Sequence, residues 1–205
     1  KRTAALVYAV LHRACAFGLR WRWLSENPCD RVQRPHHRAP RKALWSPEQL
    51  RTFLDGNREH WLHPLWSLAI ASGCRLGELL ALTWADVDFD AGTIRITKTL
   101  QHVAGQVVIG EPKTRAGVRT LVLPAGAAKA LRQQRGRQAL ARIQAGAEWS
   151  NEHDLVFTGA SGKPLQAATV DRALRGACDR LGLPAVSVHG LRHLHASLLL
   201  AEGLP

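Results

Sequence analysis

The feature that most constrains the fold of this chain is a change in hydrophobic period about halfway along it. Residues 93–97 and 118–123 alternate apolar and polar side chains, residues 106–109 form a short β-branched run, and glycines separate the three segments. On either side, apolar residues recur at the spacing of amphipathic helices. Because strands repeat every 2 residues and helices every 3.6, the pattern predicts a mainly helical α+β fold with a small three-stranded antiparallel sheet.

The helices are predicted from their start and stop signals. Ser46 and Gln49 form a capping box around Pro47, which starts a helix and with it a new domain. Gly73 ends the following helix. Helical patterns cover residues 3–24 with an interruption near Gly18, 61–72, 76–82, 125–145, 167–181 and 189–202, and residues 155–157 read as a short extended piece.

A stretch rich in proline and arginine divides the chain. Residues 25–41 read SENPCDRVQRPHHRAPR, which is typical of a basic connecting segment. The predicted organisation is therefore one helix of a preceding domain in residues 1–26, a linker in residues 27–44 and a second domain in residues 45–205.

The charge balance favours a polyanionic partner. The net charge is +12, and only six of the 28 cationic residues are lysine, so arginine dominates. Arginine presents a planar fork that binds phosphate through two parallel hydrogen bonds, whereas lysine would serve a merely solvated surface almost as well. The alternative is codon bias in a GC-rich genome, which produces the same composition.

The cysteine spacing and the hydropathy indicate in which cellular compartment the protein is expected. The four cysteines lie far apart without a CxxC pair, which fits neither a zinc ribbon nor a dense disulfide framework. No apolar run approaches the roughly 20 residues needed to span a bilayer, and the basic start lacks the apolar core of a signal peptide. We expect a protein of the reducing cytoplasm.

Two segments around the predicted sheet hold candidate phosphate-binding groups. Arg75 follows Gly73 at a helix start, where free N–H groups favour an anion, and Glu78 one turn later could orient its guanidinium. Lys113 falls at a predicted hairpin tip, from which its amine could reach into a groove. The simpler interpretations are a surface ion pair for the first two residues and a solubilising side chain for the third.

The last helix carries a third candidate group. His189 and Arg192 share one helix face, and an imidazole beside a guanidinium suits proton transfer at a phosphate. A capping histidine with a solvated arginine is the simpler alternative. A metal site is a further possibility, because three histidines lie close together, namely His189, His193 and His195. The glutamate of an HExxH motif is missing, and Arg192 would place a cation beside the metal, so no metal site is expected.

Taken in order, the segments SGCRLGELLAL, EPKTRAGVRTLVLP and HGLRHLHASLLLAEGLP resemble the tyrosine recombinases, also called the phage integrase family. The likeness extends from the linker to the last residue, and the N-terminal helix with Asn27-Pro28 is similar to the end of the core-binding domain in that family. The resemblance implies an integrase-type catalytic domain of the DNA breaking-rejoining fold, which works without metal or ATP. A tyrosine attacks the scissile phosphate, giving a 3′-phosphotyrosyl link and a free 5′-hydroxyl.

The resemblance also implies roles for individual residues. Arg75 and Arg192 match the arginines that bind the non-bridging oxygens, and Glu78 matches the acidic residue that supports the site. Lys113 matches the lysine that protonates the leaving 5′-oxygen, and His189 the histidine of the H-x-x-R motif. His193 would assist from the next turn. Further arginines expected to contact double-stranded DNA are Arg31, Arg34, Arg38, Arg41, Arg115 and Arg119.

The sequence departs from the family at the nucleophile. The family continues past the H-x-x-R helix to its tyrosine, whereas the only tyrosine here is Tyr8, outside every motif, so we expect this chain alone to be inactive in cleavage. A fragment, a natural truncation and a tyrosine supplied by a neighbouring protomer remain open, in that order. Other protomers are expected as partners on DNA, and a monomer is expected off DNA.

Three other functions remain alternatives. A non-catalytic DNA-binding remnant of an integrase would lack cleavage. A type IB topoisomerase, which shares the chemistry, would relax DNA without exchanging strands. A metal-dependent nuclease would be sensitive to a chelator.

Overall fold

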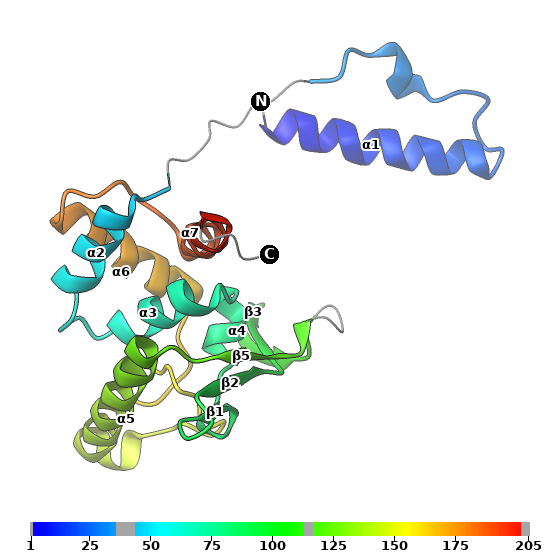
Figure 1. Ribbon diagram of the computed structural model, residues 1–205. Helices are drawn as coiled ribbons and strands as arrows, with labels where there is room; N and C mark the ends of the chain where they lie inside the picture. Colours follow the sequence, from blue (N-terminus) through cyan, green and yellow to red (C-terminus); the bar gives the residue numbers. More distant parts are fainter. Residues whose placement is uncertain (1, 36–43, 113–116, 202–205) are drawn as a thin grey trace. The chain divides into compact units, whose positions relative to one another are not determined.

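The chain folds as two compact units, Lys1–Ala43 and Leu44–Pro205, which we call the N-terminal and C-terminal units. The computed structural model describes residues 2–35, 44–112 and 117–201 (Figure 1). Within these residues, no helix combines the length and the apolar character needed to cross a membrane.

The N-terminal unit consists of the long helix α1 (Arg2–Arg20) and the 3₁₀ turn η1 (Pro28–Arg31). The Tyr8 hydroxyl donates to the Cys29 carbonyl at 3.1 Å and joins the two elements. The interruption predicted near Gly18 is wrong, because α1 continues through that residue to Arg20. Gly18 instead leaves room for the returning chain: a Cβ there would lie 3.0 Å from Leu24.

The C-terminal unit is built around helix α3 (His63–Ser72), which is apolar on nearly every face and packs against α4, α5 and α7. A helix that is hydrophobic all round belongs in the middle of a domain. The other elements are α2 (Pro47–Gly56), α4 (Leu76–Leu80), η2 (Trp84–Asp86), α5 (Ala125–Ala145), η4 (Gly146–Glu148), α6 (Ala167–Arg180) and α7 (Val188–Ala201).

The start and stop signals act as the sequence predicts. The side chain of Ser46 accepts from the backbone of Gln49, and that of Gln49 accepts from Ser46, which completes the capping box of α2. Gly73 follows α3 in the left-handed conformation, at φ 58°. Helix α5 spans 125–145, as its pattern indicates.

The predicted fold class, mainly helical with small antiparallel sheets, is confirmed, but the strands pair differently. The three-stranded sheet has the order β1-β2-β5, formed by β1 (Val87–Asp88), β2 (Thr93–Ile96) and β5 (Arg119–Val122). The segment 106–109, which was expected to join this sheet, lies in β4 (Gln106–Gly110), and β4 pairs with β3 (Thr99–Val103) in a separate hairpin.

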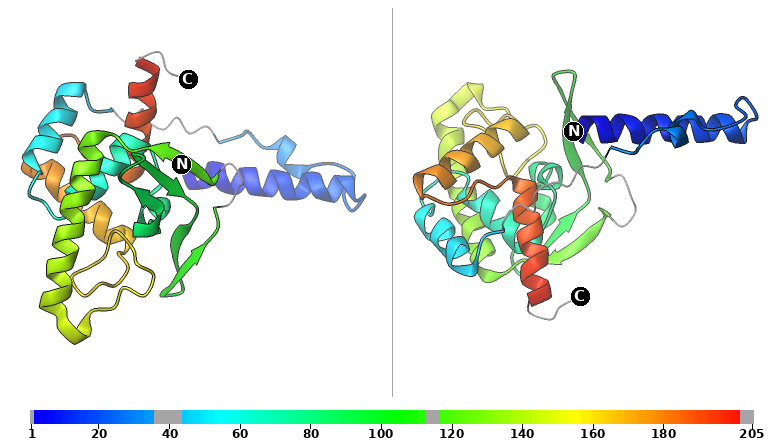
Figure 2. Two further views of the ribbon diagram at one scale, coloured as in Figure 1. Left: turned by 60° about the horizontal axis from the view of Figure 1, so that its bottom comes forward. Right: turned by 90° about the horizontal axis from the view of Figure 1, so that it is seen from above.

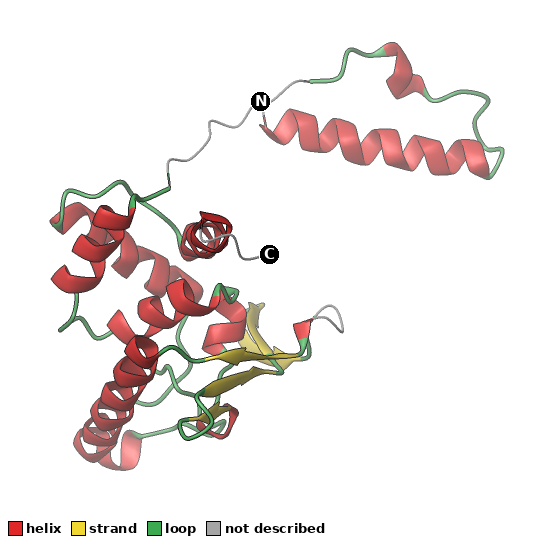
Figure 3. Cartoon of the chain, in the orientation of Figure 1, coloured by secondary structure: helices red, strands yellow, loops and turns green. Residues whose placement is uncertain are grey.

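The reason lies in the turn between β3 and β4. Ala104 and Gly105 both have positive φ, at 50° and 82°, and Val103 pairs with Gln106 across them. A two-residue turn of this kind matches the twist of an antiparallel pair, so the nearest strand is preferred over a distant one. Figure 2 shows the hairpin projecting beyond the helices, and Figure 3 shows the strands gathered on one side of the C-terminal unit.

Candidate active site

The turn between α3 and α4 presents Arg75. Because Gly73 ends α3 in the left-handed conformation, the chain reverses within two residues and Arg75 becomes the N-cap of α4. The side chain of Arg75 is 62% exposed, so its guanidinium is available to a ligand. A residue other than glycine is disfavoured at position 73, because a Cβ there would lie 2.4 Å from the ring of His195.

Glu78 is a buried carboxylate that holds Arg75. Its side chain is only 2% exposed, yet both oxygens are hydrogen-bonded. Oε2 accepts from the backbone N–H of Arg75 at 2.9 Å and from Nη2 of Arg119 at 2.8 Å, and Oε1 accepts from Nη1 of Arg75 at 2.9 Å. Burial raises the pKa of Glu78, but the hydrogen bonds donated by Arg119 and Arg75 outweigh it, so the pKa lies below its ordinary value.

Arg119 begins strand β5 and turns its guanidinium into the protein. Besides Glu78, it donates to the carbonyl of Gly117 at 2.9 Å and to the sulfur of Cys74 at 3.4 Å. The hydrogen bond to Glu78 raises the pKa of the guanidinium further. The side chain, which the sequence assigned to DNA contact, is 26% exposed.

Helix α7 brings Arg192 to the same turn. Its Nη1 donates to the carbonyl of Gly73 at 2.6 Å, although the two residues are 119 positions apart in the sequence. One turn further along α7, Nδ1 of His195 lies 2.8 Å from the carbonyl of Ile70 near the end of α3. Two side chains of α7 therefore bind carbonyl groups at the C-terminal end of α3, one in its last turn and one at its C-cap, close in sequence to Arg75.

The two histidines of the H-x-x-R segment lie against each other on α7. Nε2 of His189 and Nε2 of His193 are 3.0 Å apart, and the rings meet edge to face with centroids 4.5 Å apart. One ring donates and the other accepts, which allows a proton to pass between them. Both side chains are exposed. In the described part of the chain, no group of three His, Cys, Asp or Glu side chains is placed to hold a metal ion.

Several predicted residues lie outside the described parts of the chain, namely Lys113, Arg38, Arg41 and Arg115. The flanks of segment 113–116 are described and lie close together: a Cβ on Gly117 would be 2.3 Å from Cβ of Pro112. In the N-terminal unit, Arg31 is paired with Glu26 and Arg34 is exposed.

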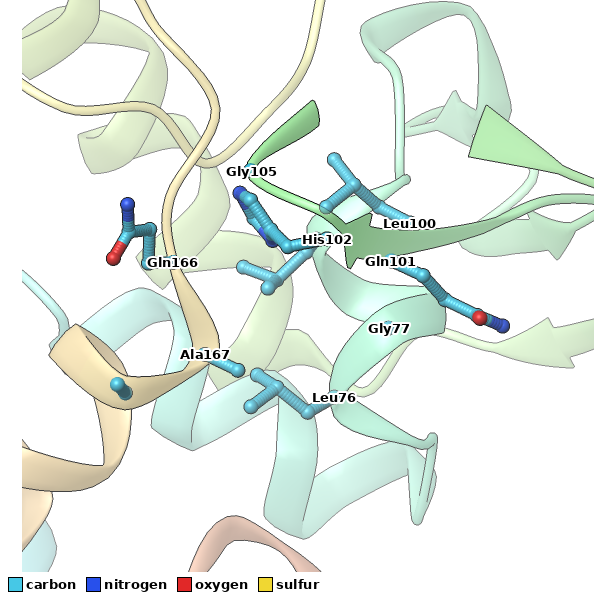
Figure 4. A pocket seen from close by; sticks show the side chains of 10 residues that line it. Leu76, Gly77, Leu100, Gln101, His102, Gly105, Gln166 and Ala167 are labelled. Carbon is cyan, nitrogen blue, oxygen red and sulfur yellow. The ribbon is translucent and has the colours of Figure 1, made fainter. Parts of the chain in front are cut away.

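Two neighbouring cavities extend from Arg75 along β3. The first, of about 390 Å³, is lined by Arg75, Gly77, Glu78, Thr99, Leu100, Gln101 and Pro112. The second, of about 580 Å³, shares Gly77, Leu100 and Gln101 and reaches Gln166, the N-cap of α6 (Figure 4). The exposed guanidinium of Arg75 thus borders a hollow, where it can bind an oxyanion.

Sequence reasoning missed two contacts that support this site. The hydrogen bond from Arg119 to Glu78 joins residues 41 positions apart, and the packing of His195 on Gly73 joins residues 122 positions apart. A signal existed for Arg119, which lies at the start of a strand in the same segment as Lys113. No local pattern distinguishes His195 from its neighbours.

Comparison with known proteins gives one consistent family. The model of the phage integrase family matches residues 46–205. A tyrosine recombinase XerC-like protein of Caldanaerobacter subterraneus subsp. tengcongensis is 28% identical over 203 residues, covering 89% of this chain and 51% of that protein. An integrase of Streptomyces ambofaciens is 37% identical over 172 residues, covering 81% of this chain and 44% of that protein. The chain therefore spans about half the length of these curated relatives.

Solved structures share the fold. The Tn1549 transposon integrase in complex with a circular intermediate DNA has a TM-score of 0.84 at 20% identity, covering 100% of this chain and 68% of that one. The lambda integrase dimer bound to a COC′ core site has a TM-score of 0.62 at 16% identity, covering 97% of this chain and 67% of that one.

Proposed function

The chain belongs to the phage integrase family, and from this premise we propose that it is the phosphate-activating part of a tyrosine recombinase. The protein would cleave and rejoin double-stranded DNA at specific sites through a 3′-phosphotyrosyl intermediate. The observation that carries the proposal is the meeting of separate motifs at one turn. Arg192 of α7 binds the carbonyl of Gly73, two residues before Arg75, whose guanidinium is held by Glu78.

In this proposal Arg75 and Arg192 bind the non-bridging oxygens of the scissile phosphate. Negative charge grows on these oxygens in the transition state, and donors already in place stabilise it most effectively. Glu78 keeps Arg75 oriented, since its buried carboxylate bonds both the backbone and the guanidinium of that residue. Lys113 would protonate the leaving 5′-oxygen.

The proposed role of His189 is proton transfer or positioning at the phosphate. Its ring contacts His193 at 3.0 Å, so His193 can hold it in place and share its proton. The proposed DNA contacts are Arg31, Arg34, Arg38, Arg41 and Arg115. Such contacts position the protein on the backbone and carry no base information by themselves.

We further propose that the attacking tyrosine is not among these 205 residues. The single tyrosine, Tyr8, lies in the N-terminal unit and donates its hydroxyl proton to the carbonyl of Cys29. The domain assignment of 1–26, 27–44 and 45–205 stays a proposal, as does a monomeric state off DNA. The bacterial and phage origin of the relatives supports action on DNA in a bacterial cytoplasm.

The test is covalent capture with the full-length product of the gene. The protein is incubated in chelator with a suicide DNA substrate, whose nick lets the cleaved end diffuse away. We expect a protein–DNA adduct that disappears when the family tyrosine of that product is changed to phenylalanine, or when Arg192 is changed to alanine. No adduct from the unchanged product would refute the proposed cleavage.

A second candidate function is a DNA-binding module without cleavage. It is favoured by one observation: the single tyrosine of these 205 residues is Tyr8, which lies in the N-terminal unit and donates to the carbonyl of Cys29. This function predicts salt-sensitive DNA binding by the full-length product and no adduct on any suicide substrate. The same experiment therefore separates the two functions.

A further inference from the structure

We infer that Arg119 is a positioning residue for Arg75, acting through Glu78, and that it is not a DNA contact. The inference rests on the proposed function, in which Arg75 binds the scissile phosphate. It reassigns a residue that the sequence grouped with the DNA-binding arginines.

The hydrogen bonds of the Glu78 carboxylate link Arg119 to Arg75. Oε2 of Glu78 receives two hydrogen bonds, from Nη2 of Arg119 at 2.8 Å and from the backbone N–H of Arg75 at 2.9 Å. These two bonds fix the plane of the carboxylate, which leaves Oε1 directed at the guanidinium of Arg75, 2.9 Å away. Without Arg119, the carboxylate keeps only the two hydrogen bonds from Arg75 itself, so no residue outside this turn holds its plane.

The exposure of Arg75 makes this orientation important. Its side chain is 62% exposed, and among the hydrogen bonds of the described residues Glu78 is the only acceptor for its guanidinium. An exposed, flexible side chain loses its preferred direction when its one anchor turns. Arg119 therefore sets where Arg75 points while remaining away from the ligand itself.

Arg119 also links parts of the fold that are distant in sequence. One guanidinium joins Gly117 at the start of the β5 segment to Cys74 in the turn after α3 and to Glu78 in α4. The distance between the sheet and the turn that holds Arg75 thus depends on this side chain.

The burial of Arg119 argues against a DNA contact. Its side chain is 26% exposed, and its guanidinium pairs with the buried carboxylate of Glu78. A residue that neutralises a phosphate contributes to the salt dependence of binding, at about 0.9 units of logarithmic slope for each phosphate on duplex DNA. Arg119 is expected to contribute none.

The experiment compares variants of the full-length gene product. Arg119→Ala removes the link and Arg119→Lys keeps the charge with one donor group. Arg119→Ala with Glu78→Gln removes the charge of a buried carboxylate that would otherwise keep only the exposed Arg75 as its counter-charge, in case the single variant unfolds. The matched control is Arg95→Ala on the neighbouring strand, because Arg95 also faces a buried carboxylate, Asp86, at 3.8 Å.

Single-turnover cleavage and DNA affinity are measured together. We expect Arg119→Ala to slow cleavage by about 10- to 100-fold, since a small misplacement of a catalytic group has effects of that size. Its Kd and salt slope should match those of the parent protein, and Arg119→Lys should recover part of the rate. The effects of Arg119→Ala and Glu78→Gln should be non-additive, because the two residues act as one unit.

Several results would overturn the inference. These are an unchanged cleavage rate in Arg119→Ala, a salt slope reduced by about one phosphate, or additive effects in the double variant.

A readout without cleavage separates this inference from the proposed function. In the 205-residue chain, the amide of Arg75 donates to Oε2 of Glu78 at 2.9 Å, which we expect to slow its hydrogen exchange. We expect Arg119→Ala, but not Arg95→Ala, to accelerate hydrogen exchange at that amide by about 10-fold or more, as local opening becomes easier. If the full-length product forms no adduct, the proposed function fails, and unchanged exchange at Arg75 would independently refute the role of Arg119.

Discussion

Replacing Gly73 by alanine tests the packing that places Arg75 and Arg192 at one turn. Gly73 has φ 58°, and a Cβ there would lie 2.4 Å from Cδ2 of His195. The left-handed conformation costs about 1–2 kcal/mol for a residue with a Cβ. His195 must also move, and the lost hydrogen bond to Ile70 adds about 1 kcal/mol.

The expected loss of stability is therefore about 2–3 kcal/mol, which lowers Tm by about 5–10 °C in a domain of this size. The assay is urea unfolding of the 205-residue chain, followed by the intrinsic fluorescence of its tryptophans, of which Trp66 lies in the core. In the full-length product the same variant should slow cleavage, because Arg192 bonds the carbonyl of the altered residue.

Gly92→Ala is the matched control. Gly92 has a similar φ of 62°, but no atom lies within 4 Å of the added Cβ, so only the backbone strain remains. The double variant Gly73→Ala with His195→Ala should remove the clash and be less destabilised than the sum of the single variants. If Gly73→Ala were no worse than Gly92→Ala, the argument from His195 would be wrong.

Three further predictions concern the same region. Gly77→Ala should destabilise the chain by about 1–3 kcal/mol in urea unfolding, because its Cβ would lie 2.9 Å from the carbonyl oxygen of Leu100, whereas Gly136→Ala, in open space within α5, should not. The pKa of Glu78 is lowered in the folded state, so its stabilising contribution is present above the ordinary value of 4.5 and is lost as the pH falls through the lowered pKa. The stability difference between the parent and Glu78→Gln should shrink on acidification, and a difference independent of pH contradicts the ionised pair. Arg192→Ala should slow cleavage by about 100-fold or more, as for loss of one transition-state donor, and an unchanged rate in the suicide-substrate assay refutes its role.

Features set by neighbouring residues could be predicted from the sequence. The capping box of α2, the end of α3 at Gly73 and the bounds of α5 all follow from residues within a few positions of one another. Helix caps, glycine turns and hydrophobic periodicity depend on interactions between residues close in the sequence. Helix and strand positions that rest on them can therefore be predicted from the sequence alone. The three segments that resemble the integrases were recognised for the same reason, as short patterns in a set order.

The features that only the tertiary structure decided are contacts between residues far apart in the sequence. Whether β4 pairs with β3 or with β5 depends on which connecting turn is more stable. The alternation of apolar and polar residues predicts a strand but does not predict its partner. The direction of the Arg119 guanidinium was decided by Glu78, a buried carboxylate 41 positions away that requires a counter-charge. Composition identified Arg119 as a cation suited to phosphate, but burial and long-range pairing determined that it faces the protein.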